Sequence, residues 1–254
     1  MNKYCLLCQD ILPQDWVFEE VFLWRRHERP VICQACQQSF CFIQEGLKCD
    51  HCYRYLTLES QDKYHQAHQL GGKYYCCECL AWQSKLPWMS LNQHILLEFN
   101  EIFRQWIHQY KYVGDYRQAQ VMRTLLKDHI KPWLAYDWIT IPSSINSIKQ
   151  RGFRATDHIL EVLGIQPVPL LTYHGNQVRQ ANKNRKERME TPQVYQLDIS
   201  KYNPESTYLL FDDIYTTGST MMRAKLAIYD GLNQAGMETE KLNITSICLA
   251  REVF

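Results

Sequence analysis

Apolar residues recur at helical spacing near the middle of the chain. They are Leu91, Ile95, Phe99, Ile102, Phe103, Trp106 and Tyr110. Steps of three and four residues put them on one face of a helix of about twenty residues. Ser90 and Gln93 form a capping-box start for this helix, and Gly114 is expected to end it. A second helix is predicted over about 115–129, stopping before Pro132.

Further along, short apolar runs alternate with helical periodicity. Strands are predicted at 137–142, 167–173, 207–211 and 243–250, and helices at 154–163 and about 219–234. Two prolines keep the second of these strands short or at an edge. The alternation implies an α/β fold, doubly wound, with a mostly parallel sheet and helices on both faces. We expect this fold over residues 87–254, with Pro87 at the boundary.

The strand predicted at 207–211 leads into Asp212-Asp-Ile-Tyr-Thr-Thr-Gly-Ser-Thr220, called the 212–220 motif below. Asp212 and Asp213 are expected at the carboxyl end of the strand, where open α/β sheets bind ligands. Carboxylates accept hydrogen bonds and therefore suit the 2′- and 3′-hydroxyls of a ribose. Gly218 permits positive φ, and the N–H groups of the next helix suit a phosphate. The hydroxyl side chains are Thr216, Thr217, Ser219 and Thr220.

The 212–220 motif resembles the phosphoribosyl pyrophosphate signature of type I phosphoribosyltransferases. That resemblance implies that Asp212 and Asp213 hold the ribose and serve catalysis, while residues 216–220 bind the 5′-phosphate. It also implies Mg²⁺ bound together with phosphoribosyl pyrophosphate. A strand, turn and helix without a ligand is the alternative, which two acids beside four hydroxyls disfavour.

Eleven cysteines are many for 254 residues, and eight of them form four C-x-x-C pairs. The pairs are Cys5/Cys8, Cys33/Cys36, Cys49/Cys52 and Cys76/Cys79. Two such pairs supply the four thiolates that coordinate a structural zinc ion tetrahedrally. Near-equal gaps of 24 and 23 residues within the first two and last two pairs favour two consecutive zinc ribbons over residues 1–86. Interleaved pairing, with the first pair joining the third, is the alternative.

The other cysteines and the overall charge add less. Cys41 and Cys77 are expected to be bystanders, and Cys248 lies in an apolar run that suits the core. Disulfides are the alternative to zinc, but a secreted scaffold would be needed to favour them, and the start of the chain is not secretory. No run of 18 apolar residues suits a membrane span. We therefore expect a soluble cytoplasmic protein without membrane insertion. The net charge of +1 argues against a global surface for polyanions.

Two basic segments are candidates for binding anions. Arg151 and Arg154, with Gly152 between them, follow the strand predicted at 137–142, so they are expected on the pyrophosphate side of the crevice. An ordinary solvated loop is the alternative. Residues 179–188 carry five basic residues against one acid, namely Arg179, Lys183, Arg185, Lys186 and Arg188. This segment is a candidate contact for a nucleic-acid backbone or a plain solvated segment.

The whole chain resembles the ComF family of bacterial competence proteins, which join cysteine-pair zinc ribbons to a phosphoribosyltransferase-like domain. The matching pieces are the four cysteine pairs, Tyr110-Lys-Tyr-Val-Gly-Asp115, Arg151-Gly-Phe153, Gln180 with Arg188, and the 212–220 motif. The sequence departs from the family at Ser143-Ser144 and at Arg154-Ala155, both on the expected pyrophosphate side. These departures leave ribose-phosphate binding better supported than turnover.

The resemblance implies a competence protein that binds phosphoribosyl pyrophosphate and handles incoming single-stranded DNA beside the DNA-uptake helicase. Two other functions stay open. One is a salvage phosphoribosyltransferase acting on a nucleobase, in which Asp212 and Asp213 stabilise the transition state electrostatically. The other is a non-enzymatic adaptor that docks a partner through its zinc ribbons.

Overall fold

The computed structural model describes residues 3–13, 30–87, 89, 92–175, 193–239, 242 and 244–252. In chain order the α-helices are α2 (Gln34–Ser39), α3 (Cys77–Lys85), α4 (Glu101–His108), α5 (Ala119–Leu126), α6 (Ile145–Arg151), α7 (Ala155–Val162) and α9 (Ser219–Gln234). The strands are β1 (His68–Leu70), β2 (Lys73–Tyr75), β3 (Gln93–Glu98), β4 (Asp137–Thr140), β5 (Leu171–Tyr173), β6 (Tyr195–Leu197), β7 (Tyr208–Tyr215) and β8 (Thr245–Arg251). Short helical turns are η1 (Gln109–Val113), which is π-helical, and the 3₁₀ turns η2 (Tyr116–Gln118), η3 (Lys131–Trp133) and η5 (Ile199–Lys201).

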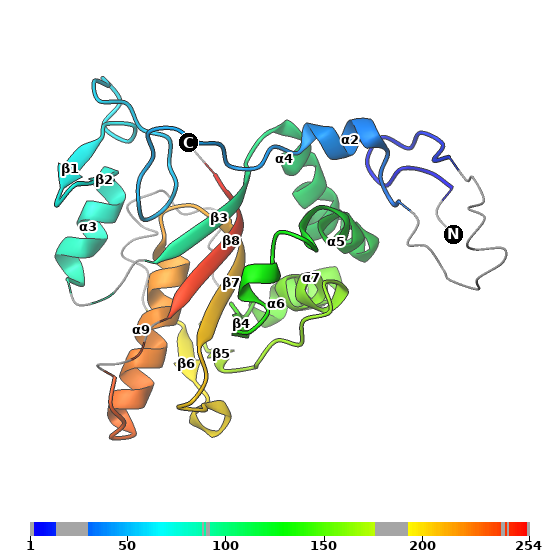
Figure 1. The fold of residues 1–254 in the computed structure, drawn as a ribbon. Coiled ribbons are helices and arrows are strands. Elements are labelled where there is room, and N and C mark those ends of the chain that lie inside the picture. Colours follow the sequence, from blue (N-terminus) through cyan, green and yellow to red (C-terminus); the bar gives the residue numbers. More distant parts are fainter. Residues whose placement is uncertain are drawn as a thin grey trace.

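The central sheet has four parallel strands in the order β3-β8-β7-β4. β7, which carries the first part of the 212–220 motif, lies inside this sheet. Figure 1 shows α9 on one face of the sheet and α4, α5, α6 and α7 on the other. The predicted α/β class with a mostly parallel sheet and helices on both faces is therefore confirmed. The antiparallel pairs β1-β2 and β5-β6 form two smaller sheets.

Each face of the sheet has its own hydrophobic core. Because strand side chains alternate between faces, Leu210 packs on the α9 side while Leu209 packs on the α4–α7 side. Cys248 is fully buried in the core on the α9 side, as the sequence predicts. The cysteines at 49, 52, 76 and 79 join that same core, whereas Cys5 and Cys36 join the other. The amino-terminal region thus packs on both faces of the sheet.

Several predicted elements are found close to their predicted positions. The helix predicted at about 219–234 is α9, the helix at 154–163 is α7, and the strands at 137–142 and 243–250 are β4 and β8. The helix predicted at 115–129 begins with η2 and continues as α5. Gly114 ends η1 in a left-handed conformation with φ 81°, as expected for a helix-terminating glycine.

The prediction of one helix from residue 91 to 110 is wrong in its first half. Residues 93–98 form β3, which pairs in parallel with β8, and α4 starts only after Asn100. Asn100 caps α4 by accepting a hydrogen bond from the Phe103 N–H at 3.2 Å. Ile95 and Leu97 are buried on alternate positions, so the same apolar residues also fit a strand period. Pairing with β8 favours the strand over the helix for residues 93–98.

Three further differences concern the surroundings of β7. The segment after Pro142 contains helix α6, which Ser144 caps by accepting from the Ser147 N–H at 3.2 Å. β7 extends to Tyr215, four residues beyond the predicted end. β6 has no counterpart among the predicted elements, and it pairs with the short β5.

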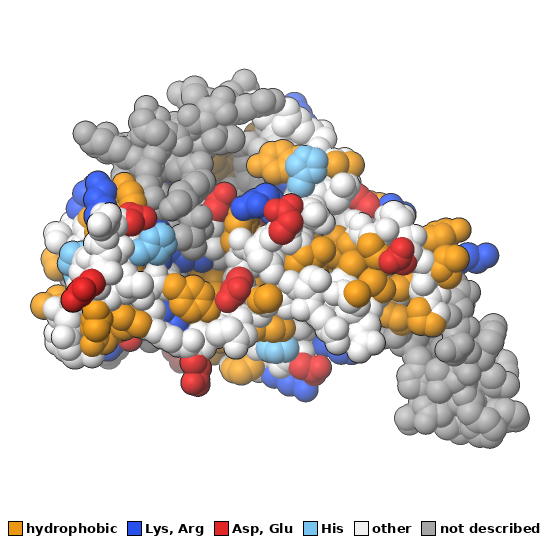
Figure 2. Space-filling model, turned by 90° about the horizontal axis from the view of Figure 1, so that it is seen from above, with side chains coloured by type: hydrophobic (Ala, Val, Ile, Leu, Met, Phe, Trp, Pro, Cys, Tyr) orange, Lys and Arg blue, Asp and Glu red, His pale blue; other side chains and the backbone are white. Residues whose placement is uncertain are grey.

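The described surface carries no single dominant charge on the face shown in Figure 2. Lys and Arg side chains lie among Asp and Glu side chains there, with hydrophobic side chains between them. This mixture agrees with the net charge of +1. No helix within the described ranges is both long and apolar enough to cross a bilayer.

Candidate functional site

Asp212 and Asp213 lie inside β7 and not after it, because pairing with β8 continues to Tyr215. The neighbouring strand β4 pairs only as far as Phe211, so both carboxylates stand beyond the carboxyl end of β4. Alternation along the strand directs the two side chains to opposite faces. Asp212 lies on the face of Leu210 and α9, and Asp213 lies on the face of α4–α7.

Asp213 is buried and forms an ion pair with Lys111 of η1. The exposed fractions of the two side chains are 4% for Asp213 and 23% for Lys111. Isolated π-helical turns such as η1 are frequent at functional sites. No periodic signal in the sequence points to Lys111, because its contact with Asp213 joins segments that are far apart in the chain. The only hint was the Lys-Tyr-Val-Gly-Asp element around it.

Asp212 is half-buried, and its surroundings disfavour a negative charge on its carboxyl. Burial raises the pKa of the Asp212 carboxyl to about 7, and the charge of Asp213 adds to this rise, while Lys111 opposes it. The Asp213 N–H donates to Asp212 Oδ1 at 2.9 Å. Burial raises the pKa of the Tyr195 phenol on β6, and the nearby charge of Asp212 adds to this rise. Asp212 therefore titrates near neutral pH and can respond to a charged ligand.

The 216–220 loop turns the chain from β7 into α9. Gly218 adopts φ 80° and occupies the N-cap position of α9. Its carbonyl accepts the first helical hydrogen bond from the Met222 N–H at 2.9 Å. The N–H groups of the first turn have no acceptor within α9, and they lie at the positive end of a helix of 16 residues.

The side chains of the loop divide into a buried pair and two half-buried hydroxyls. Thr217 Oγ1 and Ser219 Oγ lie 3.0 Å apart and form a hydrogen bond, and both residues are buried. Thr216 and Thr220 are half-buried. The buried pair fixes the loop, and the half-buried pair keeps hydroxyl groups accessible to a ligand.

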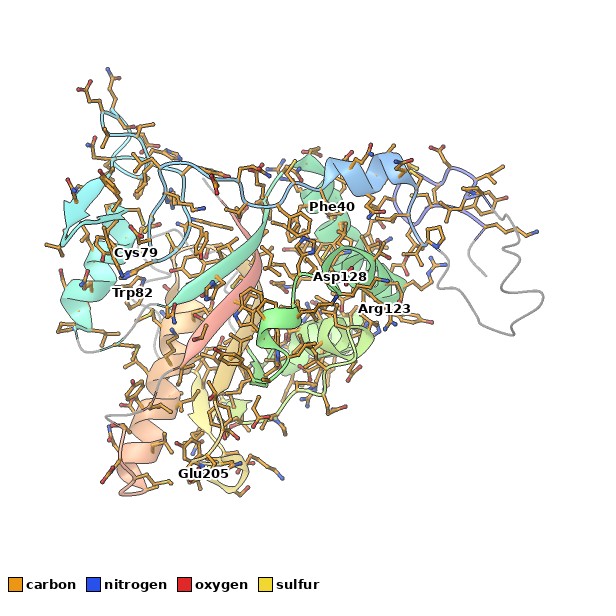
Figure 3. The ribbon with its side chains drawn as sticks, viewed as in Figure 1. Phe40, Cys79, Trp82, Arg123, Asp128 and Glu205 are labelled. Carbon is orange, nitrogen blue, oxygen red and sulfur yellow. The ribbon has the colours of Figure 1, made fainter. Side chains whose placement is uncertain are left out.

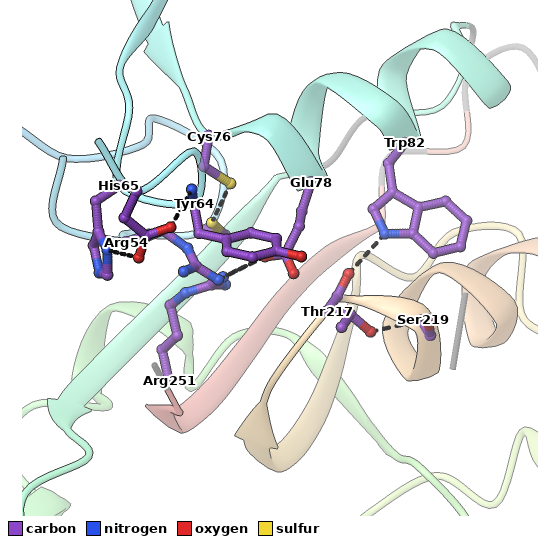
Figure 4. Close-up of polar contacts among 11 residues, drawn as sticks. Arg54, Tyr64, His65, Cys76, Glu78, Trp82, Thr217, Ser219 and Arg251 are labelled. Carbon is purple, nitrogen blue, oxygen red and sulfur yellow. Dashed lines mark hydrogen bonds and ion pairs between the residues drawn. The ribbon is translucent and has the colours of Figure 1, made fainter. Parts of the chain in front are cut away.

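The amino-terminal region contacts this loop directly. Trp82 of α3 donates its indole N–H to the Thr217 carbonyl oxygen at 2.7 Å (Figure 4). Figure 3 shows Trp82 and Cys79 together on α3, beside the start of α9. Trp82 is not among the site residues predicted from the sequence, since nothing in the local pattern relates residue 82 to the 212–220 motif.

Arg151, Gly152 and Arg154 lie where α6 turns into α7. Gly152 ends α6 with φ 83°, as a glycine at such a turn permits. The Arg151 side chain donates to the Ser147 carbonyl and to Ser143 Oγ, both at 3.2 Å. The Arg154 side chain is 65% exposed and pairs with Asp157 at 3.7 Å.

These residues border a cavity of about 380 Å³. Its lining residues are Gly114, Tyr116, Arg151, Gly152, Phe153, Arg154, Asp157, His158 and Glu161. All of them come from the segment between η1 and α7, and none comes from the 212–220 motif. The cavity lies between Gly114, which ends η1, and the turn at residues 151–154, which is predicted to face the pyrophosphate. The predicted nucleic-acid residues at 179–188 lie outside the described residues.

The eight predicted metal ligands form two clusters. The first cysteine cluster contains Cys5, Cys8, Cys33 and Cys36, and the second contains Cys49, Cys52, Cys76 and Cys79. Within each cluster the Sγ atoms all lie within 4.8 Å of one another. The consecutive pairing predicted from the spacing is thus confirmed over the interleaved one. None of the eleven cysteines, all of which lie in the described ranges, forms a disulfide, and Cys41 and Cys77 belong to neither cluster.

The geometry of both clusters fits zinc. Zn–S bonds of about 2.3 Å in a tetrahedron place sulfurs about 3.8 Å apart. The Cys8 and Cys33 sulfurs lie 3.6 Å apart, as do those of Cys52 and Cys76. With four thiolates each, both sites are closed and suited to a structural ion.

The charges around the second cysteine cluster also suit a bound metal. Glu78 Oε2 accepts from Arg54 at 2.6 Å and from Arg251 at 3.0 Å, and all three side chains are buried. Two guanidinium groups against one carboxylate leave a surplus positive charge. On both arginines Nε and Nη1 have no hydrogen-bond partner among the described atoms. A zinc ion with four thiolates carries two net negative charges and would balance this surplus.

The parallel sheet with helices on both faces and the two amino-terminal clusters of four cysteines define an α/β protein with two sites suited to structural zinc. No protein-family model matches the chain. The chain is similar to competence protein ComFC of Streptococcus pneumoniae, with 25% identity over 221 residues, covering 87% of this chain and 91% of that protein. It is also similar to competence protein ComFC of Bacillus subtilis, with 23% identity over 226 residues and 85% of each chain covered. The resemblance to the ComF family is thereby confirmed over most of the chain.

Two solved structures show a weak similarity to the chain, with TM-scores below 0.5. One is APRTase from Giardia lamblia complexed with 9-deazaadenine, with a TM-score of 0.31, 16% identity, and coverage of 56% of this chain and 83% of that chain. Another is adenine phosphoribosyl transferase from Trypanosoma brucei in complex with AMP, pyrophosphate and ribose-5-phosphate. Its TM-score is 0.32 at 10% identity, with 86% of this chain and 78% of that chain covered.

Proposed function

We propose that the protein binds phosphoribosyl pyrophosphate at the 212–220 motif. The observation that carries this proposal is the turn at Gly218, which joins two carboxylates on β7 to the amino-terminal end of α9. The N–H groups and hydroxyls at 216–220 would hold the 5′-phosphate. The Asp212 carboxylate would accept hydrogen bonds from the ribose hydroxyls. Asp213 is neutralised by Lys111, and this ion pair would hold the end of β7 in place. The pair would also set the electrostatic environment near the sugar.

The pyrophosphate would lie toward the turn formed by Arg151, Gly152 and Arg154. Arg151 is half-buried and already oriented by Ser143 and Ser147. Mg²⁺ bound with the ligand would neutralise pyrophosphate charge, and the carboxylate of Asp212 offers the oxygen ligand that this ion prefers. Asp212 and Asp213 are the candidates for a catalytic role if transfer occurs.

We further propose that the protein serves natural transformation in the cytoplasm and handles single-stranded DNA beside the DNA-uptake helicase. The similarity to two competence proteins over most of the chain supports this role. Residues 179–188 remain the candidate contact with DNA. Transformation frequency and uptake of labelled DNA in a strain carrying Asp212→Ala with Asp213→Ala test the proposal. We expect the loss seen on gene deletion, with normal protein levels, whereas unchanged transformation would favour a non-enzymatic adaptor.

Turnover is tested separately. Purified protein is incubated with phosphoribosyl pyrophosphate, Mg²⁺ and a panel of nucleobases while pyrophosphate release is recorded. Release that depends on one base and on Asp212 would identify a salvage phosphoribosyltransferase. Binding without release across the panel would identify a ligand-binding competence protein.

A further inference from the structure

Helix α3 connects the second cysteine cluster to the 216–220 loop. Cys76 occupies the N-cap position of α3 and Cys79 lies in its first turn, so a metal bound by the cluster would fix this end of the helix. Glu78 and Trp82 are four residues apart and therefore lie on the same side of α3. Both are buried, and both contact the carboxyl-end region of the central sheet.

Glu78 anchors α3 to the ends of two strands. It accepts a hydrogen bond from Arg251 at the end of β8, at 3.0 Å. The Arg251 guanidinium lies over the ring of Tyr215, the last residue of β7, at 4.9 Å from its centroid. Figure 4 shows this line of contacts from Arg54 through Glu78 to Arg251, with Cys76 beside it. The cluster is thus joined to the point where β7 enters the loop.

Trp82 and Tyr215 both pack against the backbone of the 216–220 loop. The Trp82 indole donates to the Thr217 carbonyl at 2.7 Å. A Cβ atom at Gly218 would come within 2.3 Å of the Tyr215 hydroxyl and 3.4 Å of the Trp82 indole nitrogen. Only glycine therefore fits between these rings, and the backbone at 218 rests directly on them.

The contact with Trp82 also sets the direction of a potential phosphate donor. In a planar trans peptide the C=O and N–H groups point in opposite directions. Since the Thr217 carbonyl points at Trp82, the Gly218 N–H points away from α3. Losing the indole contact would free this peptide to rotate and would remove the fixed donor.

We propose that the second cysteine cluster, acting through α3 and Trp82, positions the 216–220 loop, so that metal occupancy of this cluster and binding of phosphoribosyl pyrophosphate are coupled. The part that concerns the ligand rests on the proposed function. Coupling between two sites is reciprocal, so the ligand must in turn hold the metal of the second cluster more tightly. Trp82 is a positioning residue and does not touch the ligand.

The chain contains its own matched control. Trp106, on the other face of the sheet, donates its indole N–H to the Gln118 carbonyl at 2.9 Å and is likewise buried. Trp106 packs in the same core as Cys5 and Cys36 of the first cysteine cluster. Trp82→Phe and Trp106→Phe therefore remove the same kind of hydrogen bond, and only the first touches the loop.

Hydrogen exchange of the amides at 216–222 tests the positioning without any ligand. We expect these amides to exchange faster in Trp82→Phe, and in wild type after a chelator has removed the second zinc, than in Trp106→Phe or untreated wild type. Zinc content and circular dichroism verify that both variants are folded. Equal exchange rates at 216–222 in all four samples would overturn the proposal.

Zinc release into a chelator, with and without phosphoribosyl pyrophosphate and Mg²⁺, tests the coupling. Cys8→Ser removes an exposed ligand of the first cluster and so alters the zinc-release phase of that cluster. The phase that this change leaves unaltered is assigned to the second cluster. We expect the ligand to slow the release of the second zinc about tenfold in wild type. In Trp82→Phe the slowing should be far smaller, because the hydrogen bond that links α3 to the loop is lost. Ligand binding that leaves the phase unchanged would refute the coupling. Absence of ligand binding in wild type would refute the proposed function, and hydrogen exchange would still decide the positioning.

Discussion

Among single residues, Lys111 and Asp213 form a buried ion pair that links η1 to β7. The Asp213 carboxylate is 4% exposed, and Lys111 brings it a positive charge from η1. Removing one partner of a buried pair leaves an uncompensated charge, which costs more than the pair itself contributes. Lys111 is therefore expected to stabilise the fold as well as the candidate site.

Lys111→Met is predicted to lower the free energy of unfolding by about 2 kcal/mol at pH 8, measured by urea denaturation. The partial exposure of Lys111 keeps the cost below that of a fully buried pair. Lys111→Arg should restore most of the loss. Combining Lys111→Met with Asp213→Asn should cost much less than the sum of the single changes. Additive costs would contradict the ion pair.

Asp212 makes stability depend on pH in a predictable direction. Its pKa is raised from 3.8 to about 7, mainly by burial, so the folded state holds a proton that the unfolded chain has released between these values. This protonation stabilises the fold at low pH, and its contribution disappears as the pH rises through 7. At one pKa unit per 1.36 kcal/mol the contribution is on the order of 4 kcal/mol at most.

Asp212→Asn is therefore predicted to gain stability relative to wild type as the pH increases from 5 to 8. The amide is neutral at both pH values and carries no penalty for a buried charge. Urea denaturation of both proteins at each pH measures the effect. A difference between the two proteins that does not change with pH would show that Asp212 has an ordinary pKa.

At the scale of elements, the sequence predicted best where one local pattern had one explanation. The apolar run at 207–211, the acids and the glycine of the 212–220 motif predicted β7 and α9, because strand, turn and helix signals agreed there. Ile95 and Leu97 fitted both a helix and a strand, and only pairing with β8 selected the strand. β6 and the contacts of Lys111 and Trp82 depend on distant segments and have no local signal.

Replacing Gly114, which ends η1, tests whether the conformation of η1 affects ligand binding at the candidate site. Gly114 adopts φ 81° next to the element that supplies Lys111, and Gly164 adopts the same φ just after α7, where a Cβ atom would meet no other atom within 4 Å. Alanine in the left-handed region costs about 1–2 kcal/mol at either position. Gly114→Ala is predicted to weaken ligand binding several-fold in addition, measured by calorimetry. Equal affinities of the two variants would exclude a role for η1 in binding.

At the scale of the whole molecule, the amino-terminal region shares its cores with the sheet. The second cysteine cluster packs with Leu210 and Cys248, and the first packs with Trp106. The Gln118 side chain also donates to the Leu6 carbonyl at 2.9 Å. The division into residues 1–86 and 87–254 stays a prediction, and these contacts bear on how independent the two parts are.

A fragment of residues 87–254 is predicted to be far less stable than the full chain. Without residues 1–86 both cores would lose buried apolar residues, including Trp82 from one core and Phe40 from the other. Thermal unfolding and binding of a hydrophobic dye compare the fragment with the full chain. A fragment that melts at the same temperature would show that the carboxyl-terminal part is an autonomous domain.

Calorimetric titration in the presence of Mg²⁺ measures directly whether the 212–220 motif binds phosphoribosyl pyrophosphate. The titration uses the zinc-loaded full chain and the variant with Asp212→Ala and Asp213→Ala, whose fold is verified by circular dichroism. We expect saturable binding of one ligand per chain in wild type, with ribose-5-phosphate binding more weakly, and a loss of affinity of at least tenfold in the variant. No heat of binding in wild type, or equal affinity in the variant, would contradict this expectation.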